Sequence, residues 1–238
     1  MGNHKNNDEE KSFSSEVIDF FKDLIIIVIV VKIVTIFLVS VFIINGQSMY
    51  GSYYDKEFIL VDRFSTLEIW DYKKQNVKRW DVVVFKPHVD EIKEFFIKRV
   101  IWMPGDTIKI EDGNVFLKKS WEEKGFIQLD EKYLNTKNKG NTQAKEKTNI
   151  YTVPEGKYFV MGDNRNHSSD SRSCFSYSCS ATSRDNFIAK KYVVGKVLVD
   201  FGYFNFRKFS FTHPDITEDW KPISTVPKWM DSADSYNY

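Results

Sequence analysis

A serine, a lysine and a polar block are the residues of this chain whose types and spacing could carry out chemistry. Ser48 lies in the segment Gly46–Met49, and Lys98 lies further along, in Phe96–Val100. The block runs from Gly162 to Arg172 and contains further serine, aspartate and arginine side chains. Serine becomes an effective nucleophile when a neighbouring base removes its proton. The pattern therefore predicts nucleophilic catalysis if another of these side chains can act as the base.

Lysine can be that base when its amine is neutral. With an ordinary pKa of about 10.4, only about one lysine side chain in 2,500 is neutral at pH 7. Burial disfavours the charged amine and lowers its pKa by up to several units. Phe96 lies on the same strand face as Lys98, because side chains alternate along a strand, so the sequence offers an apolar neighbour. Taken alone, Lys98 also fits an exposed lysine on a strand.

An apolar segment at residues 24–44 precedes the serine. Its polar residues are Lys32, Thr35 and Ser40. A helix of about 20 apolar residues spans a hydrocarbon core of about 30 Å. A central lysine costs about 3 kcal/mol on insertion, and the many aliphatic residues outweigh that cost. The segment predicts an uncleaved transmembrane anchor, because it is longer than the core of a cleaved signal and ends without a small-x-small site.

The rest of the chain divides into a β-rich domain at residues 45–211 and two tails, at residues 1–23 and 212–238. Short runs of β-branched and aromatic residues predict the strands. They lie at residues 58–61, 81–85, 94–102, 106–110, 115–117, 158–161 and 192–199. The turn at residues 111–114 predicts a hairpin, because Asp, Gly and Asn accept positive φ. Residues 118–149 are rich in Lys, Asn, Thr and Glu, and we expect an exposed, partly flexible insertion.

Composition limits the ligands that we expect. The formal net charge is +1, which gives no argument for nucleic acid. Aromatic residues make up 16% of the chain, as in a β-rich core or in a surface resting on a bilayer. Cys174 and Cys179 could form a disulfide or remain free thiols, and with His167 alone nearby they do not complete a metal site. We expect no metal and no organic cofactor.

Four motifs in order resemble the type I signal peptidases, the membrane-anchored serine proteases that remove signal peptides from exported proteins. The motifs lie at residues 46–49, 81–87, 98–106 and 162–172, all after the apolar segment. The resemblance covers roughly residues 20–200, and the insertion at residues 118–149 matches least. It implies a β-rich catalytic domain behind a single transmembrane helix. It also implies a location in the cell membrane with the catalytic domain on the extracytoplasmic face.

The resemblance implies a role for each matching side chain. Ser48 attacks the scissile carbonyl, and Lys98 is the general base that later protonates the leaving amine. Ser168 matches the serine that orients this lysine, and Asp170 and Arg172 match a structural ion pair behind the site. The backbone N–H of Ser48 would be one oxyanion donor. The partners implied are preprotein signal peptides and the lipid bilayer.

The resemblance also implies shallow pockets that admit small residues at positions −1 and −3 of the cut. The substrate would bind extended, beside a strand. The residues that match the family pocket are Phe42, Ile44, Met49, Tyr53, Ile59, Val82, Phe96 and Ile97.

Several positions depart from the family pattern. Gly51-Ser52 replaces Pro-Thr after the Ser-Met pair, and Trp102 replaces a usual glycine. Asn166-His167 replaces Asp-Asn, and residues 173–189 are unlike the usual sequence. Gly46, as in other members, provides no side-chain oxyanion donor. We expect these changes to affect the fit of the substrate more than the two catalytic residues.

The sequence favours a membrane-anchored serine endopeptidase that cleaves signal peptides with a Ser48–Lys98 dyad. The main alternative is an inactive anchored β-domain that acts as a binding or accessory subunit. A thiol enzyme using Cys174 or Cys179 with His167 is another reading, as in anchored transpeptidases. A self-cleaving serine–lysine regulator is disfavoured by the apolar segment and by the lack of a DNA-binding helix pair.

Overall fold

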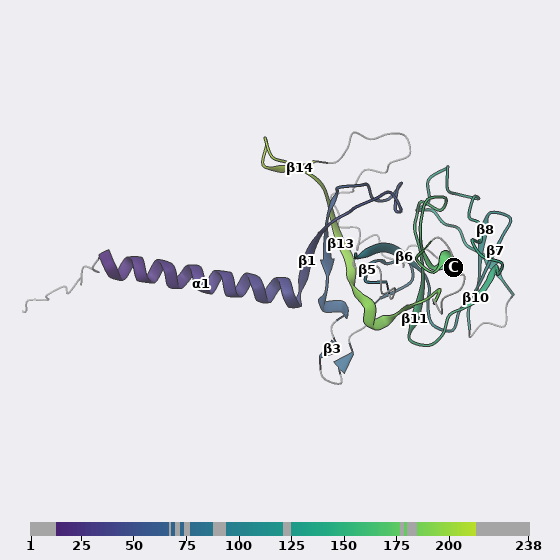
Figure 1. Ribbon diagram of the computed structural model, residues 1–238, viewed down its shortest axis with the longest axis horizontal. Helices are drawn as coiled ribbons and strands as arrows, with labels where there is room; N and C mark the ends of the chain where they lie inside the picture. Colours follow the sequence, from purple (N-terminus) through teal and green to yellow (C-terminus); the bar gives the residue numbers. More distant parts are fainter. Residues whose placement is uncertain are drawn as a thin grey trace, which may run out of the picture.

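A long helix leads into a β-rich body in the computed structural model of the protein (Figure 1). The structure describes residues 13–66, 68–69, 72–73, 77–87, 94–120, 125–176, 179 and 185–212. Residues 1–12 of the predicted N-terminal tail and residues 213–238 of the predicted C-terminal tail lie outside the described residues. The mostly β prediction is confirmed for the body of the molecule.

The predicted anchor segment is divided between a helix and a strand. Helix α1 spans Phe13–Phe37, so it begins before the predicted segment and ends before the segment does. The next residues form strand β1, Val39–Ile43, which pairs antiparallel with β2, Phe58–Asp62. Pairing with β2 gives the backbone of this β-branched stretch hydrogen-bond partners outside a helix. Within the described part of the chain, no helix is both long enough and apolar enough to cross a membrane.

The main sheet of the described chain has eight strands and is curled. Its order is β1-β2-β13-β5-β6-β11-β12, with β14 paired to β13. The strands not yet introduced are β5 Val82–Phe85, β6 Phe96–Trp102, β11 Lys157–Met161, β12 Ile188–Ala189, β13 Val193–Asn205 and β14 Ser210–Thr212. The pairing of β13 shifts register against both β2 and β5. Such irregularities bend a strand and increase its twist, which helps this sheet to curl.

A second sheet packs beside the first. It has four described strands in the order β10-β7-β8-β9: β7 Thr107–Glu111, β8 Asn114–Lys118, β9 Ile127–Gln128 and β10 Ile150–Thr152. The predicted hairpin is confirmed, because β7 and β8 pair across Asp112 and Gly113, which have φ of 48° and 77°. The smaller elements are β3 Glu68–Ile69, β4 Tyr72–Lys73, and the 3-10 helices η1 Phe64–Thr66, η2 Ser171–Ser173 and η3 Lys190–Tyr192.

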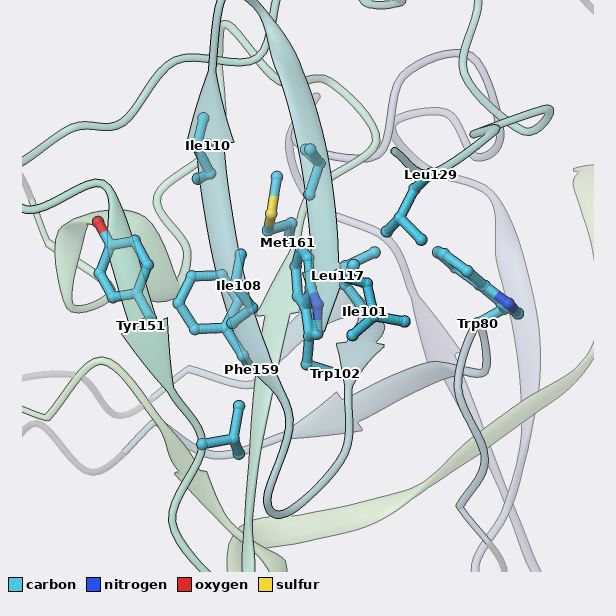
Figure 2. Packing of buried hydrophobic residues seen from close by; sticks show 12 residues of the cluster. Trp80, Ile101, Trp102, Ile108, Ile110, Leu117, Leu129, Tyr151, Phe159 and Met161 are labelled. Atoms are coloured by element: carbon cyan, nitrogen blue, oxygen red, sulfur yellow. The ribbon is translucent and has the colours of Figure 1, made fainter. Parts of the chain in front are cut away.

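Strand β6 contributes to all three described clusters of the hydrophobic core. Its end enters the cluster shared with the second sheet, where Trp102 and Phe159 are fully buried with ring centroids 5.2 Å apart (Figure 2). Val100 of the same strand belongs to a different cluster, with Val83 and Phe85 of β5. Lys98 lies on this strand too, so packing along β6 fixes where its backbone runs.

The insertion at residues 118–149 is not simply an exposed loop. Leu129 and Leu134 are buried, and so are the polar residues Glu131, Asn138 and Thr142. The composition misled the prediction, because polar side chains are buried when another part of the protein supplies their partners. Glu131 and Thr142 both accept hydrogen bonds from the buried side chain of Arg165.

We expect Phe159→Ala to destabilise the protein by about 3–5 kcal/mol, because it leaves a cavity between the two sheets. Denaturant unfolding measures this loss. Phe206→Ala is the matched control, since that ring is 76% exposed and its loss should change the free energy of unfolding little. A loss below about 1 kcal/mol in Phe159→Ala would contradict the packing described.

Candidate active site

The predicted nucleophile lies in a tight turn that follows β1. Gly46 has φ of 105°, a left-handed conformation that glycine adopts without strain, and its N–H donates to Asp55 Oδ1 at 2.7 Å. The Met49 side chain is 1% exposed, and its carbonyl accepts hydrogen bonds from the N–H groups of Ser52 and Tyr53. Because Met49 is buried, the turn is fixed and leaves Ser48 half-buried beside the protein interior.

Lys98 reaches Ser48 from strand β6. Its Nζ donates to Ser48 Oγ at 2.7 Å and to the Ile97 carbonyl at 2.8 Å, and the residue is 3% exposed. The backbone of Lys98 pairs with Val83 of β5 in the middle of the sheet. The Phe96 ring lies on one side, with its centroid 5.1 Å from Nζ. This geometry is consistent with two predictions from the sequence: that Lys98 lies within reach of Ser48, and that Phe96 is its apolar neighbour on the strand.

The environment of Lys98 favours the neutral amine. Burial lowers the pKa of Lys98 to about 8, with a smaller contribution in the same direction from the charge of Lys145. The carboxylates of Asp170 and Asp163 oppose that shift, because negative charges favour the ammonium form. A substantial fraction of this amine is therefore neutral in mildly alkaline solution, as a general base requires.

The loop that begins at Gly162 closes over the nucleophile turn. Asn164 donates from its backbone N–H to the Ser48 carbonyl at 3.0 Å and from its side chain to the Gln47 carbonyl at 2.9 Å. A Cβ atom on Gly162 would lie 2.4 Å from the Ser48 carbonyl oxygen and 2.2 Å from Ser168 Oγ. The close approach of these three segments therefore requires glycine at this position.

Ser168 lies at the site but does not bond the lysine in this arrangement. It is 2% exposed, and within the described chain its Oγ has no hydrogen-bond partner. The role of Ser168 in orienting Lys98 stays a prediction.

Asp170 and Arg172 form the predicted ion pair. Arg172 Nε and Nη2 contact the two oxygens of Asp170 at 2.9 and 2.8 Å, and both side chains are fully buried. The N–H of Gly162 also donates to Asp170 Oδ2 at 3.1 Å. Burial opposes ionisation, but Arg172 and these N–H bonds outweigh it and lower the pKa of Asp170 to about 2. The pair connects the Gly162 loop to the segment that carries Ser168.

Two further ion pairs at the site were missed in the sequence. Arg99 contacts both oxygens of Asp163, at 2.9 and 2.7 Å, and stacks over the Tyr133 ring. Arg165 is fully buried and pairs with Glu131 of the insertion. A buried arginine needs an acidic partner. Arg99, next to Lys98, and Arg165, within the last motif, were therefore the signals of ion pairs that the sequence offered. Their partners were not readable, because Glu131 lies far away in the sequence.

The eight predicted pocket residues lie mostly in one cluster. Its fully buried members include Ile44, Met49, Tyr53, Ile59 and Val82, with Phe42 and Ile97 packed against them. The eighth, Phe96, packs against the neighbouring cluster of β5 and β11. Trp102 lies instead in the core between the two sheets. We expected Trp102 to affect the fit of the substrate, but its burial there assigns it a packing role.

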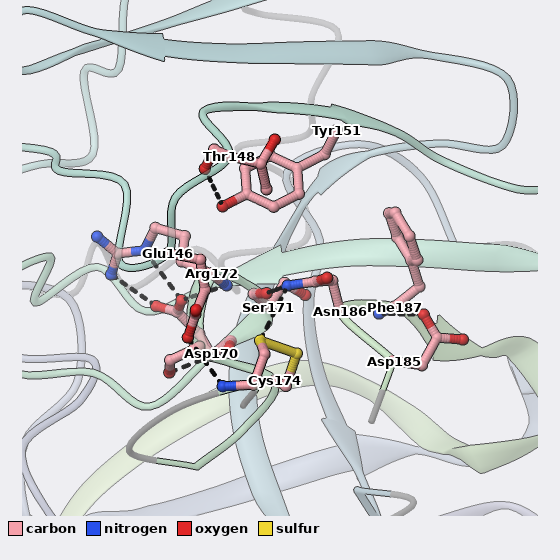
Figure 3. Close-up of a disulfide and its surroundings, with 12 residues drawn as sticks. Glu146, Thr148, Tyr151, Asp170, Ser171, Arg172, Cys174, Asp185, Asn186 and Phe187 are labelled. Carbon is pink, nitrogen blue, oxygen red and sulfur yellow. Dashed lines mark hydrogen bonds and ion pairs between the residues drawn. A yellow bond between two sulfur atoms is a disulfide. The ribbon is translucent and has the colours of Figure 1, made fainter. Parts of the chain in front are cut away.

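The two cysteines form a disulfide, Cys174–Cys179, with Cα atoms 5.2 Å apart (Figure 3). The chain has two cysteines and neither is free, so the thiol-enzyme alternative is wrong for this structure. The side chain of His167 is exposed, and its backbone N–H donates to the Asn164 carbonyl. His4, His88 and His213 lie outside the described residues.

Comparison with known proteins points to one family. The family model "Signal peptidase, peptidase S26" matches residues 17–201. Signal peptidase I P of Bacillus subtilis subsp. natto is 33% identical over 169 residues, covering 69% of this chain and 83% of that protein. Signal peptidase I of Bacillus caldolyticus is 31% identical over 185 residues, covering 77% of this chain and 90% of that protein. A crystal structure of a signal peptidase I from Enterococcus faecalis is 28% identical, with a TM-score of 0.36, and covers 51% of this chain and 97% of that one. A TM-score of 0.36 is too low to support an argument from the structure, so the family assignment rests on the sequence matches.

We expect Arg172→Met to destabilise the protein by about 3–5 kcal/mol, because it leaves Asp170 buried without its countercharge. Lys132→Met is the control, since that lysine is 60% exposed and lies 3.8 Å from Asp130. It should cost no more than about 1 kcal/mol in denaturant unfolding. In the wild type, the pair's contribution should be full above the ordinary carboxyl pKa and be lost as pH falls toward about 2. Equal losses in the two variants would contradict this account.

Proposed function

Because the chain belongs to the signal peptidase family, peptidase S26, and is a serine endopeptidase of the signal peptidase I type, we propose that it removes N-terminal signal peptides from exported preproteins. Ser48 is the nucleophile and Lys98 is the general base. The observation that carries this assignment is the 2.7 Å contact between Lys98 Nζ and Ser48 Oγ, made by a lysine that is 3% exposed.

The reaction follows from the proton affinity of the two groups. Neutral Lys98 takes the proton of Ser48 Oγ as that oxygen bonds to the scissile carbonyl carbon. The carbonyl becomes a tetrahedral oxyanion, and the backbone N–H of Ser48 is one donor to it. The ammonium of Lys98 then gives its proton to the leaving amine, and the C–N bond breaks. Water attacks the acyl-enzyme with Lys98 again as base, which releases the signal peptide and restores Ser48.

The loop around Gly162 supports this chemistry by positioning. Asn164 holds both carbonyls of the nucleophile turn, at Gln47 and Ser48, so the turn cannot move away from Lys98 without breaking two hydrogen bonds. The buried Asp170–Arg172 pair keeps that loop in place. When the reacting atoms are already held at a fixed separation, less conformational entropy is lost in reaching the transition state. In this proposal, Ser168 contacts Lys98 when the substrate is bound.

The substrate binds as an extended segment near β1. Strand β1 is the last strand at one end of the main sheet, next to Ser48 in sequence, so its outer backbone groups are available to a further strand. Side chains at residues 42 and 44 of this segment reach the cluster behind the nucleophile. Close packing in that cluster leaves little room, which fits a preference for small residues near the cut. Bulky residues are excluded by contact with Ile44, Met49 and Tyr53.

The enzyme associates with the cell membrane through α1, with its β-rich domain on the extracytoplasmic face. Apolar side chains are exposed on all sides of α1; Ile25, Val30 and Ile36 are each at least half exposed. A large exposed apolar surface indicates contact with lipid or protein. The β13–β14 turn adds Phe206 and Phe209, which are 76% and 84% exposed, on either side of two basic residues. Aromatic and basic residues together favour a lipid interface.

We expect Ser48→Ala and Lys98→Ala each to abolish cleavage of a model preprotein by detergent-solubilised protein, with the cut site read by mass spectrometry. The wild type should cut after a small-x-small site. Its kcat/KM should rise with pH through a midpoint near the Lys98 pKa of about 8, because the neutral amine is the active form. The kcat/KM should be lost as pH falls below that midpoint.

Circular dichroism and thermal unfolding of the two variants are the controls, since both substitutions should leave the fold intact. Cleavage that persists in Ser48→Ala would refute the dyad. A folded wild type that leaves several preproteins uncut would favour an inactive binding domain instead.

The membrane proposal predicts that the full-length protein sediments with membranes and stays there after alkaline carbonate extraction. The large exposed apolar surface of α1 is the physical reason, because carbonate removes proteins held by charge alone. Immunoblotting of the pellet and supernatant measures the outcome. Release of most of the protein into the supernatant would contradict it.

A further inference from the structure

A short segment of the insertion, Thr142–Glu146, acts as a strap across the block that carries Ser168 and Arg172. Thr142 Oγ1 accepts from Arg165 Nη1 at 2.7 Å, and the Gln143 carbonyl accepts from Arg172 Nη1 at 3.1 Å. Glu146 Oε1 accepts from the N–H of Cys179 at 2.8 Å, next to the disulfide (Figure 3). Ala144 and Lys145 lie between Gln143 and Glu146, so these contacts hold Lys145 near the active site.

Lys145 is held against Ser168 by this strap. Its Nζ donates to the backbone carbonyl of Ser168, whose hydroxyl lies beside Gly162 and the Ser48 carbonyl. Nothing in the mechanism above uses this lysine. The ammonium of Lys145 can donate to this carbonyl while it keeps its positive charge.

We propose that Lys145 is a positioning residue of the Ser48–Lys98 dyad: it fixes the Ser168 carbonyl and keeps a second positive charge beside Lys98. This inference rests on the proposed function, because it assumes that Lys98 is the base. Lys145 does not touch the reacting atoms. It acts through Ser168 and through its charge.

The charges around Lys98 give the direction of the effect. Asp163 and Asp170 face the amine and favour its charged form, while Lys145 opposes them. Ser48 contributes a neutral hydroxyl, and Phe96 contributes an aromatic face. Burial is the largest influence on the pKa of Lys145 and lowers it. The carboxylate of Asp170 raises this pKa, and the charge of Arg172 lowers it. Removing the charge of Lys145 leaves the two carboxylates less opposed, so Lys98 should hold its proton to higher pH.

The test measures kcat/KM against pH for the full-length detergent-solubilised protein and three variants. In Lys145→Gln, we expect the midpoint of the acidic limb to move up by about half a pH unit, which lowers kcat/KM about threefold on the acid side. The plateau above the limb should change less. Lys145→Arg keeps the charge and donor groups and should keep the midpoint of the wild type. Lys147→Gln removes the same charge from the same segment, and no hydrogen bond of Lys147 is among those of the described residues.

If the acidic limb of the kcat/KM profile has the same midpoint in Lys145→Gln as in the wild type, the proposal is overturned. An equal movement in Lys147→Gln also overturns it, because the effect would then belong to the charge of the whole segment and not to the contact with Ser168. Lys145→Arg is a test in its own right should Lys145→Gln fail to fold: a limb that moves to higher pH in this variant also overturns the proposal.

The failure of the proposed function would look different. If the wild type cleaves no preprotein, or if Ser48→Ala still cleaves, the dyad itself is wrong. A different result would show that only the role of Lys145 is wrong. In that case the wild type cleaves, Ser48→Ala and Lys98→Ala are inactive, and Lys145→Gln has the same acidic limb of kcat/KM as the wild type. The three Lys variants should all show the thermal unfolding of the wild type.

Discussion

Removing water from one lysine is the constraint on which the rest of the site depends. In the proposed mechanism, Lys98 must be neutral to act on Ser48, and burial is the largest influence that lowers its pKa, to about 8. Burial requires apolar walls on several sides, so the amine sits on a central strand of the curled sheet with the Phe96 ring against it. The same burial removes the thermal motion that would carry a long side chain away from the serine. One requirement therefore explains both the position of the lysine and its geometry.

That requirement conflicts with the carboxylates needed to hold the surrounding loops. Asp163 and Asp170 both favour the charged form of Lys98. Each is held by a two-point contact to an arginine, Arg99 and Arg172 respectively. A bidentate guanidinium offsets part of the field of its carboxylate while fixing its geometry. Asp170 also accepts hydrogen bonds from the backbone N–H groups of Gly162 and Arg172, so this pair fixes the loop near the lysine. Burial is the largest influence on the pKa of Lys98 and exceeds the opposing effect of the two carboxylates.

The sequence predicted the parts of this arrangement that are local. Strand alternation placed Phe96 beside Lys98, and Asp112-Gly113 marked the hairpin between β7 and β8. The end of α1 was not predictable from hydropathy, because pairing with β2 turned the last apolar residues of the segment into a strand. The Asp170 partner of Arg172 was implied by the resemblance. The Glu131 partner of Arg165 and the Gln143 contact of Arg172 were out of reach, since both come from an insertion that reads as solvent-exposed. Long-range pairing of polar groups leaves no periodic signal in a sequence.

The insertion illustrates how a fixed catalytic pair can be adjusted from outside it. In the proposed mechanism, a substitution at Ser48 or Lys98 removes a reacting group, and a substitution at Asp163 or Asp170 leaves an arginine without its ion-pair partner. In the role proposed for it, Lys145 acts only through its charge near the amine and through its contact with the Ser168 carbonyl. The charge of Lys145 influences the pKa of Lys98 less than burial does, but it acts on a buried amine, where a nearby charge is poorly screened by water. A polar loop attached to the back of the site is therefore a natural place to tune the base.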